Sequence, residues 1–292
     1  MIPVYSFILD AERPISLGIS KCRDPAIPIP QWVRPVKFRT RMKWLFRSRS
    51  LIFLMDKLGG PDPGTTHEYS WKGTRLHYRP GTSDQAVIYE ILLRPDRKAD
   101  YWLPPDIQAK VVLDIGANIG IASTYLSRRF PQAQIYAFEP IPANFSLLKA
   151  NVDPLGNVRP IQAALGATDG AVEMFQSDTG MNLGGYSFYE AGSDTKVRTR
   201  VEIRRASSMM RELNLPSADV IKIDTEGSEY AILTDLGKEF LRNVQWIYGE
   251  LHGNNDFELL AFLSDQFDIG VKRTMGKRLF MFQARNRKAS SG

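Results

Sequence analysis

Five side chains that can carry charge or move a proton each follow an apolar run of strand length. They are Asp114, Glu139, Asp224, Glu226 and His252. The carboxyl ends of parallel strands meet at one edge of an open α/β sheet, and ligands bind in the crevice there. A carboxylate in such a crevice can hold a cation or accept hydroxyl groups, and a histidine can accept a proton. The sequence therefore predicts one site for ligand binding and proton transfer.

The most informative segment is residues 111–120, which read V-V-L-D-I-G-A-N-I-G. Gly116 and Gly120 after an apolar strand allow a tight turn and a close approach of the backbone to a cofactor at a helix N-terminus. Dinucleotide sites favour G-x-G-x-x-G, whereas this loop is G-x-N-x-G with Asp114 before it. A carboxylate at that place repels a pyrophosphate and attracts a cation such as the sulfonium of S-adenosylmethionine.

Two further positions complete the predicted cofactor site. Glu139 follows a predicted strand at residues 134–138, at the spacing where a carboxylate can accept both hydroxyls of a ribose. Ala164 ends a predicted third strand at residues 158–164. An ordinary glycine turn is the competing interpretation of the loop, but it leaves Glu139 without a role. The predicted S-adenosylmethionine site consists of Asp114, Gly116, Asn118, Gly120, Glu139 and Ala164.

The predicted catalytic groups lie in I-K-I-D-T-E-G-S-E at residues 221–229 and E-L-H at residues 250–252. His252 is the first candidate for the base, because it lies at the carboxyl end of a predicted strand. Asp224 and Glu226 are predicted to orient it or to act as alternative bases. Glu229 suits the first turn of the next helix, so a structural role is preferred for it. For His252 itself, a purely structural role is the competing interpretation.

A metal-assisted site is an alternative use of the same residues. Asp224, Glu226, Glu250 and His252 could together hold a divalent cation that acidifies a hydroxyl group. The preferred interpretation assigns no metal ligands. The chain has one cysteine, Cys22, which excludes an internal disulfide framework and a multi-cysteine zinc site.

From residue 111 the sequence alternates strands and helices, as a doubly wound, mostly parallel sheet requires. The predicted fold is a Rossmann-like α/β sheet closed by an antiparallel hairpin. Its parallel strands are predicted at residues 111–115, 134–138, 158–164, 220–223 and 244–248, its helices at 119–129 and 143–151, and its hairpin strands at 267–271 and 279–282. Alternating residues at 171–175 and 196–203 predict two antiparallel strands, with a flexible loop at 180–185 between them.

Residues 1–73 are predicted to form an N-terminal extension of the domain at residues 74–292. Six prolines in the first 35 residues indicate an irregular arm. Residues 37–58 predict a basic helix whose apolar residues fall all round its axis, so packing against the domain is favoured over contact with a membrane surface. A strand at 74–78 and a helix at 85–93 follow, the latter after the helix-capping residues of R-P-G-T-S-D.

Composition and charge limit the class of protein. A chain of 292 residues at 43% hydrophobic can bury a full core. The net charge of +6 comes from two segments without acids, residues 37–49 and 272–288. The rest of the chain is acidic. Asp224 and Glu226 follow the fourth predicted strand, and their negative charges would repel phosphates, which argues against a nucleic-acid substrate. The start of the chain has no basic n-region, and no segment has the length of a membrane span, so a cytoplasmic location is expected.

Taken together, D-I-G-A-N-I-G, F-E-P, I-K-I-D-T-E-G-S-E and E-L-H, with R-P-G-T-S-D upstream, resemble the FkbM-type methyltransferase family. The resemblance covers about residues 79–282. It implies a class I methyltransferase sheet, the cofactor S-adenosylmethionine, and O-methylation of hydroxyls on polyketides and sugars. The family wording has valine and alanine at the places of Thr225 and Ser228, and the four charged or glycine positions around them are intact.

The predicted function is therefore O-methylation of a hydroxyl on a sugar, glycan or polyketide-type metabolite. An acceptor oxygen attacks the sulfonium methyl in line, and the protein holds the reacting atoms collinear and removes the hydroxyl proton. The alternatives are metal-assisted O-methylation and a module that binds the cofactor without turnover. A dehydrogenase is a further alternative, and it requires binding of nicotinamide.

Overall fold

The computed structural model describes residues 38–60, 62, 64–95, 99–176, 186–187, 198–253, 255–273 and 280–288. All of them belong to one compact unit that begins at Lys37. The arm predicted at residues 1–35 and the loop predicted at residues 180–185 lie outside the described residues.

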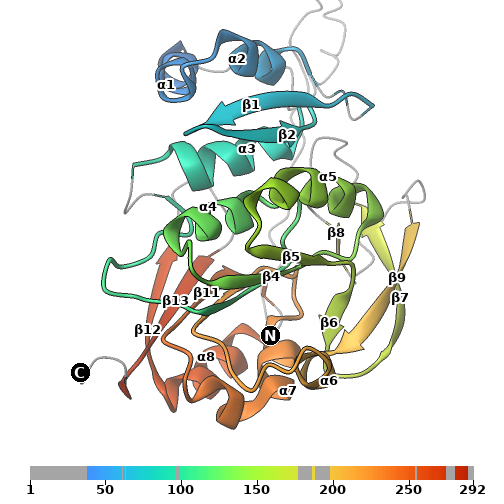
Figure 1. Ribbon diagram of the computed structural model, residues 1–292, viewed down its shortest axis with the longest axis vertical. Helices are drawn as coiled ribbons and strands as arrows, with labels where there is room; N and C mark the ends of the chain where they lie inside the picture. The colour runs from blue at the N-terminus through green and yellow to red at the C-terminus, as the bar shows by residue number, and fades with distance from the viewer. Residues whose placement is uncertain are drawn as a thin grey trace, which may run out of the picture. The chain divides into compact units, whose positions relative to one another are not determined.

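A seven-stranded sheet forms the centre of this unit (Figure 1), in the order β12-β13-β11-β10-β3-β4-β5. Its five parallel strands confirm the predicted Rossmann-like class. They are β3 (Val111–Ile115), β4 (Gln134–Phe138), β5 (Val158–Ile161), β10 (Val220–Ile223) and β11 (Trp246–Leu251). The order of strands reverses between β3 and β10, which is where open α/β sheets bind ligands.

The predicted closing hairpin is also confirmed, with longer strands. β12 (Phe267–Arg273) and β13 (Phe280–Asn286) are antiparallel, and β13 pairs antiparallel with β11. β13 pairs with both β11 and β12, and this pairing continues beyond the short alternating segments that predicted the hairpin. The hairpin thus extends the sheet at its edge, beside β11.

Helices cover both faces of the sheet, so its strands bury side chains on both sides. α4 (Ile121–Arg129) and α5 (Pro142–Val152) pack over one face, with the core residues Val112, Val220 and Trp246. The other face carries Leu113, Ile221 and Ile247. It is covered by α6 (Ala206–Glu212), α7 (Glu229–Leu241) and α8 (Asp256–Ser264).

A small second sheet corrects one prediction. The strand predicted at residues 158–164 ends at Ile161, where Ala163 N bonds back to Ile161 O at 3.1 Å and turns the chain out of the central sheet. Ala164 instead begins β6, whose partner is β9. The second sheet has the order β6-β9-β7-β8, with strands β6 (Ala164–Gly166), β7 (Gly170–Gln176), β8 (Tyr186–Ser187) and β9 (Arg198–Arg205). The antiparallel pairing of β7 and β9 is as predicted.

The single helix predicted at residues 37–58 is two helices, α1 (Phe38–Ser48) and α2 (Leu51–Leu58). Arg49 has a φ of 53°, which no α-helix interior adopts, and the Ser50 hydroxyl accepts a hydrogen bond from Phe53 N as the cap of α2. Ser50, which caps α2, therefore marks the break between the two helices. On the inner side, the Trp44 ring stacks on Tyr89 with centroids 4.5 Å apart.

A β-hairpin crosses the boundary predicted at residue 73. β1 (His67–Trp71) pairs antiparallel with β2 (Thr74–Tyr78), so the boundary falls in the turn between them. The helix predicted at residues 85–93 begins earlier, as α3 (Ser83–Ile88) with Thr82 as its cap, and continues as a π-helical turn, Tyr89–Leu93. This region packs onto α4 and α5 and joins the core of the domain.

Candidate active site

The glycine loop between β3 and α4 is held between two neighbouring strands. The backbone N–H groups of Gly116 and Ala117 donate to Phe138 O at 3.0 and 2.8 Å. A Cβ placed on Gly116, whose φ is 79°, lies only 1.8 Å from the carbonyl oxygen of Asp224. Only glycine fits there, because both the left-handed conformation and the close approach exclude a side chain. The predicted cofactor loop therefore contacts the predicted catalytic segment directly.

Asp114 is fully buried and already has a cationic partner, which the sequence analysis did not identify. Lys222 lies opposite it in register on β10, and its Nζ is 3.2 Å from Asp114 Oδ1. The Ser123 hydroxyl donates to Asp114 Oδ2 at 2.6 Å. The predicted attraction between Asp114 and a sulfonium is thus largely satisfied within the protein, and Asp114 acts on the loop through Lys222.

Lys222 connects this ion pair to the glycine loop. Its ammonium donates to Gly116 O at 2.5 Å and to Ile115 O at 3.4 Å. Burial alone lowers the pKa of Lys222, but the charges of Asp114 and Asp224 and the hydrogen bond to Asp114 together leave the pKa above its ordinary value. The lysine is therefore a fixed cation that orients the carbonyl groups at the start of the loop.

Glu139 lies at the end of β4 and is buried. Its two carboxylate oxygens accept hydrogen bonds from Asn118 N and Ile141 N, each at 2.9 Å. Burial raises the pKa of Glu139 to about 7, although these backbone hydrogen bonds oppose the shift. Asn118 has a φ of 51°, and its Oδ1 is buried without a hydrogen-bond partner among the described residues. A buried acceptor beside a buried carboxylate suits a ligand with hydroxyl or amino donors.

The R-P-G-T-S-D motif contacts Glu139 indirectly, through Asn144. The Arg79 guanidinium forms a bidentate pair with Asp84 at 2.7 and 2.9 Å, and both side chains are buried. Arg79 Nη2 also donates to Asn144 Oδ1 at 2.9 Å, and Asn144 Nδ2 lies 3.5 Å from Glu139 Oε1. The fixed planar fork of arginine orients the amide of Asn144, which in turn faces Glu139. Arg79 and Asn144 are therefore positioning residues that the sequence analysis missed.

Of the other predicted cofactor residues, Gly120 has a φ of 84° and precedes α4. Ala164 is separated from the loop by the end of β5 and packs instead with Ile141 and Val201. The structure thus brings Gly116, Asn118, Gly120 and Glu139 together around one loop. Ala164 lies on the small sheet and packs with Ile141, whose N–H donates to Glu139.

Three carboxylates surround one histidine at the carboxyl ends of β10 and β11. His252 Nε2 lies 3.7 Å from Asp224 Oδ1, 3.5 Å from Glu226 Oε2 and 3.8 Å from Glu250 Oε2. The side chain of His252 is only 5% exposed, and its Nε2 has no hydrogen-bond partner in the described part of the chain. Glu226 has a φ of 55°, an unusual conformation of the kind found at functional sites. The predicted catalytic residues are therefore brought together.

Glu229 has both the structural role that was predicted and a second contact. It is the first residue of α7, and its carboxylate accepts from Thr225 N at 2.8 Å. The same oxygen lies 3.0 Å from His252 Nδ1. Burial alone raises the pKa of Glu229, but the hydrogen bond and charge of His252 lower it overall. Glu229 therefore remains a carboxylate that fixes the Nδ1–H tautomer of His252 and directs Nε2 towards the acids.

The electrostatics of this group favour an additional cation. Burial alone lowers the pKa of His252, but the hydrogen bond to Glu229 and the charge of Asp224 raise it to about 9. Burial raises the pKa of Glu226 to about 7, and the charge of Asp224 adds to that shift. The protein by itself thus holds His252 in the imidazolium form near neutral pH. A cation bound beside the carboxylates offsets their charge and favours the neutral, basic form.

The same group has the donors for a divalent cation. One ligand atom from each of Asp224, Glu250 and His252 lies within 4.8 Å of the others. Two carboxylates and one imidazole are a suitable partial set for a cation that keeps some water ligands. The geometry therefore allows both the preferred site without a metal and the metal-assisted alternative.

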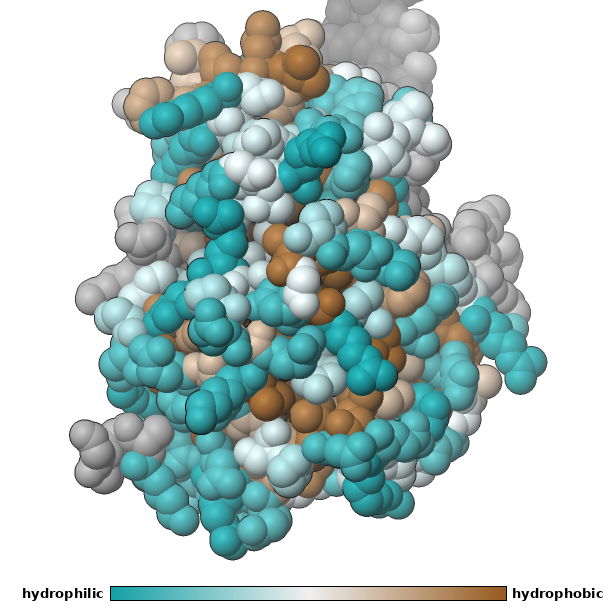
Figure 2. Space-filling view, in the orientation of Figure 1, coloured by the Kyte–Doolittle hydropathy of each residue, from teal (hydrophilic) through white to brown (hydrophobic). Residues whose placement is uncertain are grey.

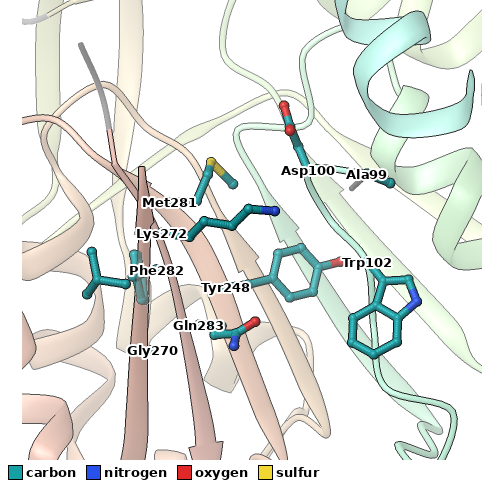
Figure 3. Close-up of a pocket in the computed structure, with 10 residues that line it drawn as sticks. Ala99, Asp100, Trp102, Tyr248, Gly270, Lys272, Met281, Phe282 and Gln283 are labelled. Carbon is teal, nitrogen blue, oxygen red and sulfur yellow. The ribbon is translucent and has the colours of Figure 1, made fainter. Parts of the chain in front are cut away.

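A groove of about 410 Å³ lies between the hairpin and residues 99–102 (Figure 3). Figure 3 shows Tyr248 pointing across it towards Trp102, with Lys272 and Gln283 along the hairpin side. Met281 and Lys272 lie in the same cross-strand row as Glu250, which carries the row into the carboxylate group.

Tyr101 forms a second connection between the groove and the carboxylates. Its hydroxyl donates to Asp224 Oδ2 at 2.8 Å, and its ring packs on Tyr248 with centroids 5.1 Å apart. Tyr101 precedes β3 by ten residues of irregular chain, so no local pattern in the sequence indicated this contact. Tyr101 therefore contacts both Asp224 and Tyr248, a residue that lines the groove.

Comparison with known proteins assigns the family. Methyltransferase sdnD of Sordaria araneosa is 32% identical over 194 residues, which are 54% of this chain and 73% of that protein. The 2-O-methyltransferase NoeI of Sinorhizobium fredii is 26% identical, covering 51% of this chain and 65% of its own. The hexuronic acid methyltransferase AglP of Haloferax volcanii is 28% identical, covering 50% and 57%. Residues 114–279, more than half of the chain, match the methyltransferase FkbM domain, and the protein belongs to this methyltransferase family.

Proposed function

We propose that the protein is an S-adenosylmethionine-dependent O-methyltransferase that acts on a hydroxyl group of a sugar, a glycan or a polyketide-type metabolite. The observation that carries the proposal is His252. Its Nδ1 contacts the buried Glu229, and its buried Nε2 lacks a partner among the described residues and faces Asp224 and Glu226. A base with a fixed tautomer at the edge of a cofactor crevice is the arrangement that proton removal from a hydroxyl requires.

The cofactor site is supported by the residues around the glycine loop. Asn118 and Glu139 would bind donors on the cofactor, because one offers a buried unpaired oxygen and the other a buried carboxylate. S-adenosylmethionine, when bound, supplies an electrophilic methyl group on a positively charged leaving group. The carboxylates of Asp224, Glu226 and Glu250 provide a negative environment beside that site. This environment favours a cationic cofactor over a pyrophosphate.

The proposed base is His252 in its neutral form. The acceptor hydroxyl donates its proton to Nε2 as the oxygen attacks, and Glu229 stabilises the resulting imidazolium through Nδ1–H. Tyr101 holds Asp224 by a hydrogen bond at 2.8 Å. Asp224 therefore has a fixed direction and can orient the acceptor hydroxyl or the imidazole.

The groove beside the hairpin is the proposed site of the acceptor. Trp102 and Tyr248 offer flat aromatic surfaces, and Gln283 and Lys272 offer hydrogen-bond donors. This combination suits a ring that carries several oxygen atoms. The names of NoeI and AglP associate two relatives with O-methylation and with a sugar acid, which supports a sugar-like acceptor.

A metal-assisted reaction is the second candidate. It is favoured by Asp224, Glu250 and His252, whose ligand atoms lie within 4.8 Å of one another. In this candidate a divalent cation, rather than the imidazole, lowers the pKa of the acceptor hydroxyl. His252 is then a ligand and not a base, so the two candidates differ in their response to a chelator.

The proposed function is tested by identifying the methylated product. The purified protein is incubated with methyl-labelled S-adenosylmethionine and an extract of a strain that lacks this gene. We expect a labelled product whose methyl group resists mild alkali, because the methyl ether of a hydroxyl is stable to base. A label released by alkali would indicate a carboxyl ester, and label transferred to nucleic acid would contradict the proposed acceptor class.

The pH dependence of cofactor binding tests the role of Glu139. Hydroxyl donors bind its carboxylate form, and burial places its pKa at about 7 in the unliganded protein. Affinity for S-adenosylhomocysteine should therefore be constant above that pH and fall about tenfold for each pH unit below it. Titration calorimetry at several pH values measures the slope. Glu139→Gln should bind more weakly and lose the slope, whereas a slope that persists in this variant assigns it to another group.

His252→Ala should lower kcat by about 10² to 10⁴, with nearly unchanged affinity for S-adenosylhomocysteine, because a general base acts in the transition state. His77→Ala is the matched control, since His77 lies on β2. For the proposed base, EDTA leaves the wild-type rate unchanged. Under the metal-assisted candidate, EDTA abolishes activity and magnesium or manganese restores it. Full activity of His252→Ala in EDTA contradicts both candidates.

Trp102→Ala should raise the KM for the acceptor about tenfold, equivalent to about 1.4 kcal/mol of lost stacking, while cofactor affinity stays the same. Phe257→Ala is the control, because this exposed aromatic side chain lies on α8 and away from the groove. Steady-state kinetics with the acceptor found by the labelling experiment gives KM and kcat, and calorimetry gives the cofactor affinity. An unchanged KM excludes the groove as the acceptor site.

A further inference from the structure

The outer face of α1 and α2 exposes a group of large apolar side chains, which we call the apolar patch. It consists of Met42, Phe46, Leu51, Ile52, Met55 and Leu58. Phe46 is 83% exposed and Ile52 is 68% exposed. In the part of the chain that the structure describes, the other exposed large apolar side chains are Phe257, Val271 and Phe280. Figure 2 shows a brown area over α1 and α2 at the top of the view, besides smaller brown areas lower down.

The patch is held rigidly on the domain and does not belong to a loose helix. Phe53 and Leu54 of α2 are buried, and the Tyr69 hydroxyl bonds to Ser48 O at 2.9 Å. Trp44 lies between Phe53 and Tyr89, with centroids 5.9 and 4.5 Å away. The inner face of the two helices therefore carries the packing that the sequence predicted. The outer face remains exposed because the break at Arg49 turns α2 and separates the two sets of apolar residues.

The charges around the patch have one sign. Of the cations in α1, α2 and the turn between them, Lys43 and Arg49 are exposed. Arg47 and Lys57 are turned inward, because Arg47 donates to the Tyr89 hydroxyl at 2.7 Å and the Lys57 ammonium lies over the Trp44 ring. The one acid in this segment, Asp56, is directed inward and is bound by Tyr78 and His67. Glu68 on the neighbouring β1 lies within 4.0 Å of Arg75 and 3.8 Å of His77. The exposed cations beside the apolar patch are thus Lys43 and Arg49, and no acid of α1 or α2 is directed towards them.

We propose that the apolar patch binds the surface of a membrane that contains anionic phospholipids. Apolar side chains at a helix surface insert at the boundary between headgroups and acyl chains, and neighbouring Lys and Arg residues attract anionic headgroups. The exposed apolar side chains and the neighbouring cations are complementary. Either insertion or charge attraction alone gives weak membrane binding, and the two together give stable attachment. None of the described helices combines the length and hydropathy of a membrane span.

The charge of the patch border favours a lipid surface over a second copy of this chain as the binding partner. A second copy of this chain presents the same basic border, so a symmetric dimer through the patch places like charges together. An anionic lipid surface presents negative charge over the whole area that the patch covers. The proposal is independent of the methyl-transfer reaction, since none of the six apolar residues contacts the glycine loop or the carboxylates.

Vesicle sedimentation with the full-length protein tests the proposal. We expect the protein to pellet with vesicles of phosphatidylcholine and phosphatidylglycerol in equal parts, more weakly with phosphatidylcholine alone, and progressively less as salt increases. Phe46→Ser with Ile52→Ser should weaken binding to the anionic vesicles about tenfold or more. Lys43→Glu should reduce the preference for anionic vesicles.

Phe257→Ser is the matched control for exposed hydrophobicity, because Phe257 is 87% exposed and lies on α8. It should bind vesicles as the wild type does. Affinity for S-adenosylhomocysteine and the thermal unfolding midpoint should be the same for all variants, which shows that they are folded. The proposal is overturned if the full-length protein does not pellet with anionic vesicles, or if the Phe46 and Ile52 variant pellets as well as the control. A dimer that the same two substitutions dissociate, without vesicle binding, reassigns the patch to self-association.

Discussion

The buried ion pair between Asp114 and Lys222 is the interaction on which the site depends. The two residues lie opposite each other on neighbouring parallel strands, at the point where the order of the strands reverses. A buried pair has little net effect on stability, but removal of one partner costs about 3 to 5 kcal/mol because the other charge stays buried. Lys222 also holds Gly116 O, so the pair fixes the first residues of the loop. The position of Asn118, whose N–H donates to Glu139, follows from that loop.

A surplus of negative charge governs the other half of the crevice. Three carboxylate oxygens lie between 3.5 and 3.8 Å from His252 Nε2, and Glu229 contacts the opposite nitrogen. Such a group is stable when a cation is present, either the imidazolium itself or a bound ligand. The binding of a positively charged ligand and the protonation of His252 are therefore linked, because a positive charge near the carboxylates lowers the pKa of the imidazole. The same surplus explains why a divalent cation is the natural alternative occupant.

The sequence predicted the parts of the fold that are encoded locally. Apolar strands, glycine turns and acids at strand ends gave the parallel sheet, the Gly116 loop, Glu139 and the group around His252, because each signal spans only a few residues. It did not predict Lys222 as a buried partner, since a lysine between two isoleucines also fits a strand with one exposed face. The contacts from Arg79 to Asn144 and from Tyr101 to Asp224 span 65 and 123 residues. No periodicity carries that information, so these positioning contacts appeared only with the structure.

Two errors have similar causes. The third strand was predicted to run to Ala164, but it ends at Ile161. Apolar composition alone does not show that Ala164 joins the second sheet, because its partner there, Ile203, is distant in sequence. The helix predicted at residues 37–58 missed the break at Arg49, although Ser50 is a good cap. The apparent distribution of apolar residues all round one helix was therefore the sum of two helices with different orientations.

The most direct test of the account is titration calorimetry of the purified protein with S-adenosylhomocysteine and, separately, with NAD. The glycine loop, the buried Glu139 and the surplus of carboxylates predict a dissociation constant of micromolar order for the first ligand, about −8 kcal/mol, and no measurable heat for the second. Binding of NAD without binding of S-adenosylhomocysteine would contradict the assignment of the crevice to a methyl donor.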